Sequence, residues 1–263
     1  MTVALAQVSQ EELRREILHT WETAKHSWVV PIHIGPLDLS INKIVWFMWI
    51  GAAITFLVLF VGSRLLKDRP GAYQVIVEEV YGFGRQFLGG QLGEEGRKWM
   101  PYTLSIFVFL LTLNLIGLIP GTYPVTSNIT FTATLAILTF ILTQYEGVKR
   151  NGVGAYLKSF VPPGLPAKPI MVPFMFLSEI LQQFTRPLTL ALRLYANILA
   201  GHLIIFVFLS FILYFGTLTA VISVPVAIVL YAFEIFVAVL QAYIFAILTQ
   251  VYIELAIYAE EQH

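Results

Sequence analysis

The sequence predicts an all-α membrane protein with about five transmembrane helices, the last two long and strongly tilted as a hairpin, plus an amphipathic membrane-surface helix. Of the 263 residues, 57% are hydrophobic and only 12% are charged, whereas soluble domains are typically about 25% charged. The mean hydropathy is +0.77. Apolar runs long enough to cross a hydrocarbon core about 30 Å thick recur along the chain.

Two regions are predicted. Residues 1–40 are of mixed composition and form an extracytoplasmic segment, with a short amphipathic helix over 10–26 and an extended stretch over 29–40. Residues 41–263 form a single transmembrane domain. Its predicted spans lie at about 44–66, 101–119, 129–146, 174–215 and 225–259.

The segments between the spans complete this plan. Residues 71–92 mix apolar and charged side chains and are too polar to span, so they are predicted to lie on the cytoplasmic membrane face. Pro101 favours a helix start. The proline-rich stretch 161–173 is predicted as a loop, and the segment from Gly216 to Pro225 as a turn. The last two apolar segments far exceed 20 residues, so they must tilt strongly, bend or run along the membrane.

The distribution of basic residues sets the orientation. Arg64 and Lys67 lie at the end of the first span, and Lys149 and Arg150 follow the third, whereas loop 120–128 has no charge. By the positive-inside bias the N-terminus is outside and the C-terminus cytoplasmic, although Lys43 weakens this assignment at the first span. A bacterial plasma membrane is the predicted location.

Composition also excludes several functions. The formal net charge is zero, so nothing electrostatic favours nucleic acid. The absence of cysteine excludes disulfides and thiolate metal sites. Gly89, Gly90 and Gly93 do not form a phosphate-binding motif, and no nucleophile–base pair is evident. We therefore predict no catalytic residue, no cofactor and no metal.

Arg193 is the most informative residue, because it stands within a long apolar run. A guanidinium stays charged at any physiological pH, and placing it in mid-membrane costs about 2.5–3.5 kcal/mol. One interpretation is an arginine that snorkels to the interface or closes a structural ion pair. The other is a fixed positive charge on an ion path.

Polar residues recur at helical spacing around Arg193. Positions three or four residues apart share one helix face, and this face carries Glu179, Gln182, Arg186, Arg193 and Asn197, with His202 about one turn further and to the side. The last helix has a second polar face with Glu234, Gln241 and Tyr252. In an antiparallel hairpin the two faces can meet, with Gln241 near the depth of Arg193.

This pattern suits two offset half-channels for protons. His202 and Glu234 lie toward the outer end and Glu179 toward the inner end, with an obligate cation between them. A proton that enters from outside cannot pass Arg193 and must transfer to a carboxylate on a moving partner. Near the guanidinium that carboxylate is favoured to release its proton, which then leaves by the Glu179 side.

Three segments together resemble the subunit a family of F-type ATP synthases. Segment 186–202 (RPLTLALRLYANILAGH) resembles its arginine motif, 240–252 (LQAYIFAILTQVY) its last-helix motif, and 114–120 (NLIGLIP) its second-span motif. The resemblance covers most of the chain and is strongest from about 175 to 252. It implies a non-catalytic stator subunit that packs against a rotating ring of c subunits, with peripheral-stalk b subunits and the lipid bilayer as further partners, and couples proton flow to ATP synthesis.

The resemblance also assigns roles to single positions. It implies that Arg193 is the essential arginine and Gln241 its partner, that Glu179 is the inner half-channel acid, and that the outer polar positions are Asn114, Asn197, His202 and Glu234. Some members carry an acid at the position of His202 and a histidine at that of Glu234. The exchange keeps a proton-capable pair and favours protons over sodium. Asn114 and Asn197 can equally bond helices together.

Three other classes of membrane protein fit the sequence less well. A stand-alone ion channel is the first alternative, since it predicts conductance by the chain alone. A secondary transporter would need its own substrate site, often with inverted repeats, and no internal repeat is evident. An intramembrane protease would need a Ser–His pair or two aspartates in mid-membrane. The only aspartates, Asp38 and Asp68, lie outside the predicted spans.

Overall fold

The computed structural model describes residues 33–34, 37–38, 40–61, 72–84, 86, 98–119, 122–160, 168–215 and 219–258. Near the start of this part, β1 (His33–Ile34) and β2 (Leu37–Asp38) pair antiparallel. These short strands agree with the extended conformation predicted for 29–40. The helix predicted over 10–26 lies outside the described residues.

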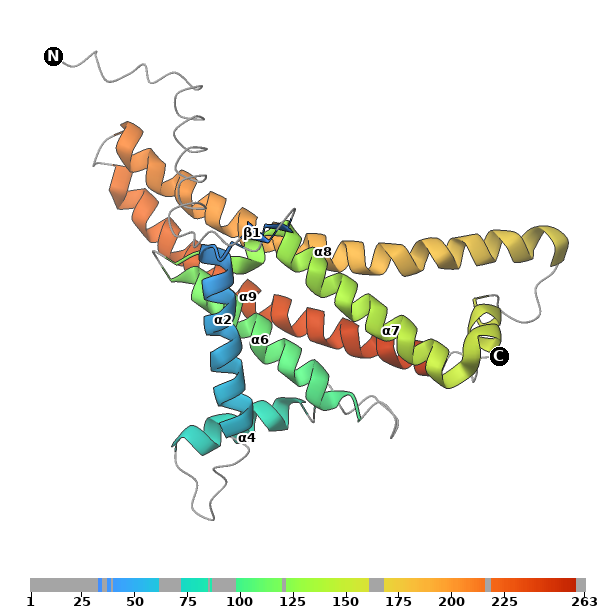
Figure 1. Ribbon diagram of the computed structural model, residues 1–263. Coiled ribbons are helices and arrows are strands. Elements are labelled where there is room, and N and C mark those ends of the chain that lie inside the picture. Colours follow the sequence, from blue (N-terminus) through green and yellow to red (C-terminus); the bar gives the residue numbers. More distant parts are fainter. Residues whose placement is uncertain are drawn as a thin grey trace.

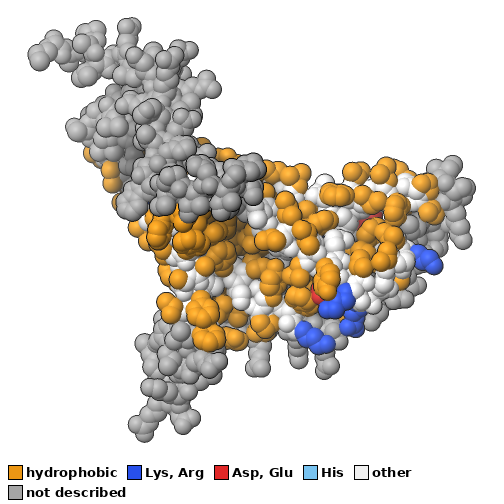
Figure 2. All heavy atoms as spheres, viewed as in Figure 1, with side chains coloured by type: hydrophobic (Ala, Val, Ile, Leu, Met, Phe, Trp, Pro, Cys, Tyr) orange, Lys and Arg blue, Asp and Glu red, His pale blue; other side chains and the backbone are white. Residues whose placement is uncertain are grey.

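Five helices in the described part of the chain are long and apolar enough to cross a membrane, which confirms the predicted fold class. They are α2 (Lys43–Phe56), continued by the π-helical turn η1 (Leu57–Val61), then α6 (Met100–Leu118), α7 (Ile129–Lys158), α8 (Lys168–Phe215) and α9 (Ala220–Ile257). On the face drawn in Figure 2, hydrophobic side chains cover most of the described surface, and Lys and Arg side chains gather toward one end.

The two last helices are the longest, as predicted. Helix α8 has 48 residues, a length of about 72 Å at 1.5 Å per residue, which is more than twice the hydrocarbon thickness of a bilayer. Figure 1 shows α8 and α9 joined as a hairpin, and α8 running at a wide angle to α2. This arrangement suits a hairpin that lies strongly tilted in the membrane.

Local sequence signals explain where several helices begin. Asn42 precedes α2, and its side-chain oxygen accepts a hydrogen bond from the backbone N–H of Val45 at 3.1 Å. Asn128 precedes α7 and accepts from the N–H of Thr130 at 2.9 Å. Such side chains satisfy N–H groups that have no partner within the helix. Pro101 lies in the first turn of α6, as predicted.

The main core lies where α6, α8 and α9 meet. Leu104 and Leu110 of α6, Leu194 of α8 and Phe245 of α9 belong to one buried cluster. Helix α2 packs on the other side of α6 through Gly51, where a Cβ atom would lie 2.5 Å from Leu113 Cδ2. The core therefore holds α8 and α9 against α6 and fixes which face of α8 points outward.

The uncharged segment between α6 and α7 folds inward. It contains the 3₁₀ turn η3 (Val125–Ser127), whose residues are all buried, and Ser127 Oγ donates to the carbonyl of Pro124 at 2.8 Å. Burial raises the pKa of Tyr123 above its usual range, so this phenol stays neutral. Burying a segment without charged side chains costs little free energy when its polar groups are hydrogen-bonded.

The described part of the surface helix lies within the predicted range of 71–92. Helix α4 (Ala72–Phe83) crosses the foot of α2 at a wide angle (Figure 1), and residues 87–92 lie outside the described part. On the exposed side of α4, Gln74 Nε2 donates to Glu78 Oε1 at 2.7 Å. Just beyond α4, Gly84 is buried, and a Cβ atom there would lie 3.0 Å from Leu104.

Three predicted boundaries differ from the structure. Helix α7 continues past residue 146 to Lys158, α8 begins at Lys168 within the predicted loop 161–173, and α9 begins at Ala220, so that Pro225 lies inside a helix instead of a turn. Pro173 and Pro225 are each the sixth residue of their helix, where proline removes one intrahelical hydrogen bond. Membrane helices tolerate such a loss when neighbouring helices or local adjustments satisfy the freed carbonyl. The proline-based prediction therefore made two connections too long: the loop before α8 and the turn before α9.

Helix α7 is interrupted once. Gly152 adopts φ +76° and ψ 156°, a conformation almost restricted to glycine. A Cβ atom would meet nothing within 4 Å at either Gly152 or Gly154, so the two positions differ in backbone conformation and not in space.

Gly152→Ala is therefore expected to destabilise the protein by about 1–3 kcal/mol, the cost of holding a non-glycine residue in this region. Gly154→Ala is the matched control and is expected to be neutral or stabilising by up to about 1 kcal/mol, because alanine is the better helix former. Thermal unfolding of the two variants in detergent would measure the difference. Equal midpoints would show that the turn at Gly152 is not held in the folded protein.

Candidate functional site

Arg193 lies on the outward side of α8. Leu190, three residues earlier, and Leu194, the next residue, are buried in the core with α6 and α9. Arg193 itself is exposed. Within the described part of the chain its guanidinium makes no hydrogen bond and no ion pair. The described residues therefore do not support the interpretation of Arg193 as part of a structural ion pair.

The surface around Arg193 is made of small side chains. The same side of α8 carries Thr189, four residues before Arg193, and Ala196 and Ala200, three and seven residues after it. All three are exposed. Small residues allow another helix to approach closely. A charge in the bilayer usually faces protein or a water-filled cavity and not lipid, so this side of α8 is suited to a protein partner.

Gln241 of α9 lies close to the level of Arg193, but its side chain points into the protein. It is 1% exposed, and its Oε1 accepts a hydrogen bond from Asn197 Nδ2 at 2.9 Å. The second amide atom, Nε2, is buried and has no acceptor among the described residues. The pair therefore joins α8 to α9 and retains one donor for a further group.

Asn114 joins the same region from α6. Its Nδ2 donates to the carbonyl of Ala238 in α9 at 3.0 Å, and the side chain is 1% exposed. Both asparagines that the sequence left open, Asn114 and Asn197, thus bond helices together. A role of either residue on a proton path stays a prediction.

Glu234 is a buried carboxyl group in the half of the hairpin nearer the connection between α8 and α9. It is 4% exposed, and a Cβ atom at Gly201 would lie 2.5 Å from Glu234 Oε1. Glycine at 201 is therefore what allows the carboxyl group to lie against α8. The contact brings Glu234 to the turn of α8 that carries His202, whose side chain lies outside the described part.

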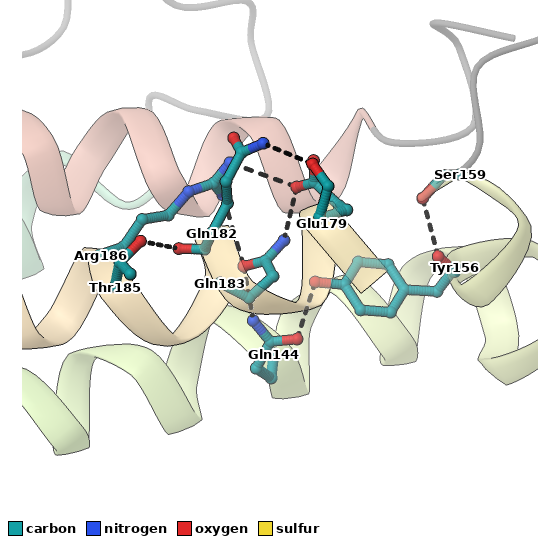
Figure 3. A network of polar contacts seen from close by, with 9 residues as sticks. Gln144, Tyr156, Ser159, Glu179, Gln182, Gln183, Thr185 and Arg186 are labelled. Atoms are coloured by element: carbon teal, nitrogen blue, oxygen red, sulfur yellow. Dashed lines mark hydrogen bonds and ion pairs between the residues drawn. The ribbon is translucent and has the colours of Figure 1, made fainter. Parts of the chain in front are cut away.

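Glu179 lies at the other end of the hairpin, within a polar network (Figure 3). Its Oε1 is 3.4 Å from Arg186 Nη2 and accepts from Gln183 Nε2 at 3.4 Å. The guanidinium of Arg186 lies 5.3 Å from the centre of the Tyr252 ring of α9. Arg186 is thus the paired cation of α8, in contrast to Arg193.

The network extends to residues that the sequence analysis did not select. Gln144 Nε2 of α7 donates to Gln183 Oε1 at 3.1 Å, and Tyr156 O–H donates to Gln144 Oε1 at 2.9 Å. Gln183 could have been found, because it lies four residues after Glu179 on one face of α8. Gln144 and Tyr156 could not, since no local pattern links them to α8.

The described side chains contain no group of three or more His, Cys, Asp or Glu that could hold a metal ion. What the hairpin offers instead is a linear arrangement along α8 and α9. A buried carboxyl group lies toward one end, a paired carboxyl group toward the other, and an exposed arginine between them. Such an arrangement offers proton-exchanging groups at two places, with a fixed positive charge between them.

Comparison with known proteins agrees with this geometry. Residues 45–254 match the family model described as ATP synthase A chain. The chain is 70% identical over 98% of its length to ATP synthase subunit a of Rubrobacter xylanophilus, all of which is covered. It is 41% identical to subunit a of Chlorobium phaeobacteroides over 85% of the chain and 68% of the relative. The chain therefore belongs to the ATP synthase subunit a family, as a multi-pass, proton-translocating subunit of the membrane sector.

Proposed function

We propose that the chain forms two offset proton half-channels against a rotating ring of c subunits and thereby couples proton flow to ring rotation and ATP synthesis. The observation that carries this proposal is the position of Arg193. It is exposed on the side of α8 that bears small residues, and it makes no hydrogen bond or ion pair with the described part of the chain. A carboxylate presented by a ring subunit is the group that would complement this charge.

The spacing along α8 supports two half-channels that do not connect. Glu179 lies about 21 Å before Arg193, and Gly201, which contacts Glu234, lies about 12 Å after it, at 1.5 Å per residue. A proton would enter by His202 and Glu234, with Asn114 and Asn197 lining the outer path. It would cross on the ring and leave by Glu179. A potential of 100 mV supplies about 2.3 kcal/mol for each charge that crosses.

Gln241 would act beside the arginine. Its buried amide accepts from Asn197, which lies one turn of α8 after Arg193, so Gln241 would hold the turn of α8 that carries the arginine and would not reach the ring itself. The described hairpin thus presents the cation of Arg193 to the partner, and this charge favours the ionised carboxylate there.

We further propose that residues 1–40 lie outside and that residues 41–263 form one transmembrane domain of a bacterial plasma membrane, with the C-terminus in the cytoplasm. In support, Lys149 and Arg150 lie in the C-terminal third of α7, next to Asn151, whose Nδ2 donates to the carbonyl of Ala256 near the end of α9 at 2.9 Å. Basic residues favour the cytoplasmic side. The exposed polar side of α4 is the surface proposed for the peripheral-stalk b subunits.

Glu179→Gln tests the inner half-channel. In membranes carrying the whole complex, ATP-driven proton pumping is expected to fall by about tenfold, the scale of a lost proton-transfer group, because an amide cannot exchange the proton. Ser178→Ala, a neighbour that keeps the ion pair of Glu179, is the matched control. Pumping at the wild-type rate in Glu179→Gln would contradict the inner path. Proton conductance by the chain alone in lipid vesicles would favour the ion-channel alternative.

A further inference from the structure

The turn at Gly152 brings Tyr156 back over α7. Tyr156 is 3% exposed, and a Cβ atom at Gly147 would lie 2.6 Å from its ring. The ring also packs against Ala256 of α9 and, edge to face, against Phe160 at a centroid distance of 5.2 Å. The phenol is therefore held rigidly between α7 and α9, with its oxygen directed toward α8 (Figure 3).

The hydrogen bonds that start at this phenol run in one direction. An ionised carboxylate can only accept, so Gln183 must present its NH₂ group to Glu179. Its oxygen then accepts from Gln144 of α7 and from Arg186 Nη1 of α8, the latter at 3.4 Å. Gln144 must then present its own NH₂ group to Gln183, which leaves its oxygen to accept from Tyr156 O–H. The three successive hydrogen bonds, from Tyr156 to Gln144, from Gln144 to Gln183 and from Gln183 to Glu179, measure 2.9, 3.1 and 3.4 Å.

We infer that Tyr156 is a positioning residue for Glu179 and acts through the two amides of Gln144 and Gln183. This inference rests on the proposed role of Glu179 in the inner half-channel. Hydrogen bonds in such a chain polarise and order one another. Glu179 and Arg186 favour one orientation of the Gln183 amide. The buried phenol holds Gln144 in the matching orientation, and Gln144 in turn supports Gln183, so that the NH₂ group of Gln183 stays directed at the carboxylate.

The position of the network supports a role in proton transfer beyond packing. Glu179 and Arg186 are only partly buried, with side-chain exposures of 26% and 24%. A flexible carboxyl group would have several orientations open to it at such a place. Next to Arg186, a small cavity with about 10 Å³ for the centre of a water molecule is lined in part by Gln183 and Tyr252. A volume of this size fits one water, between α7, α8 and α9.

Tyr156→Phe removes the first donor and leaves the ring. In membranes carrying the whole complex, we expect ATP-driven proton pumping to fall by about fivefold, the factor that one ordinary hydrogen bond represents. We also expect the dependence of pumping on cytoplasmic pH to be displaced, which a merely structural role of the ring would not produce. The charged and titratable side chains at this site are Arg186 from α8, Tyr156 from α7 and Tyr252 from α9.

Tyr231→Phe is the matched control. Tyr231 O–H donates to the carbonyl of Leu118 at 2.8 Å, so this variant also removes one phenolic hydrogen bond between helices, but away from Glu179. It is expected to retain the wild-type rate and pH profile. Identical behaviour of the two variants would overturn the inference.

A second test uses Gln183→Met. Tyr156 and Gln183 are joined through Gln144 and not by a bond of their own. The double variant that combines Tyr156→Phe with Gln183→Met therefore tests whether they act through one series of hydrogen bonds. We expect the double variant to pump no more slowly than Gln183→Met alone. Multiplied losses would mean that the two residues act independently, and the inference would be wrong.

These outcomes separate the inference from the proposed function. Wild-type pumping by Glu179→Gln would refute the inner path and the inference together. Strong impairment of Glu179→Gln beside wild-type behaviour of Tyr156→Phe would refute the inference alone. The amount of assembled complex is measured for each variant. If Tyr156→Phe fails to assemble, Gln144→Met interrupts the same chain, and wild-type pumping by that variant would overturn the inference.

Discussion

Arg193→Ala is expected to abolish ATP-driven proton pumping in membranes that carry the whole complex, with the complex still assembled. Arg193 is exposed, and within the described part of the chain it makes no hydrogen bond or ion pair. Its removal should therefore leave the packing of α8 unchanged. What is lost is the fixed charge that, in the proposed mechanism, separates the two half-channels and draws the ring carboxylate into its ionised form. Quenching of a ΔpH-sensitive dye after addition of ATP measures the effect.

Two further variants make this result specific. Leu188→Ala truncates an exposed side chain one to two turns earlier in α8 and is expected to pump at nearly the wild-type rate. Arg193→Lys keeps the charge but loses the planar fork that can bind a carboxylate through two hydrogen bonds, so a large loss is expected here too. Pumping by Arg193→Ala at a rate near that of Leu188→Ala would make Arg193 a structural residue, although membership in the family would stand.

Glu234→Gln is expected to lower proton pumping by at least about tenfold, because the amide has the size of the carboxyl group but exchanges no proton. Gly201→Ala should reproduce much of this loss without touching the acid, since its Cβ atom would lie 2.5 Å from Glu234 Oε1 and displace the group. The initial rate of ATP-driven pumping is again the measurement.

Ser223→Ala serves as the control for both variants. Ser223 is a buried polar residue near the outer end of the same helix, with 3% exposure, and its loss is expected to leave the pumping rate unchanged. If all three variants pumped equally well, Glu234 would not lie on the outer path. If Glu234→Gln alone were impaired, the carboxyl group would tolerate displacement by Gly201→Ala, and its position against α8 would not be required.

The outer and inner ends of the hairpin differ in how their carboxyl groups are held. Glu234 is 4% exposed and lies against a glycine, so its position is determined by close packing of two helices. Glu179 is partly exposed and is held by Arg186 and a chain of amides. Packing tolerates little change in volume, whereas a hydrogen-bonded group responds to the loss of a donor. The two ends should thus be sensitive to different kinds of substitution.

Much of the fold could be predicted because a bilayer restricts the choice of structure. Only helices satisfy all backbone groups of a single-segment span in lipid, so the number of apolar runs gave five spans, as observed. Helix ends were less predictable. The continuation of α7 to Lys158 and the start of α8 at Lys168 depend on tertiary contacts such as that of Tyr156 with Gly147 and Ala256. A proline-rich composition contains no information about those contacts.

The sequence by itself determined the membrane class, the placement of Arg193 within an apolar helix and the helical spacing that puts Glu179, Arg186 and Asn197 near one face. These follow from composition and from the 3.6-residue period, which are local properties. Only the tertiary structure decided that Arg193 points outward while Gln241 points inward to Asn197, and that Tyr156 and Gln144 reach Gln183. Helices that are distant in sequence make these contacts, and how each helix is rotated toward its neighbours is set by core packing.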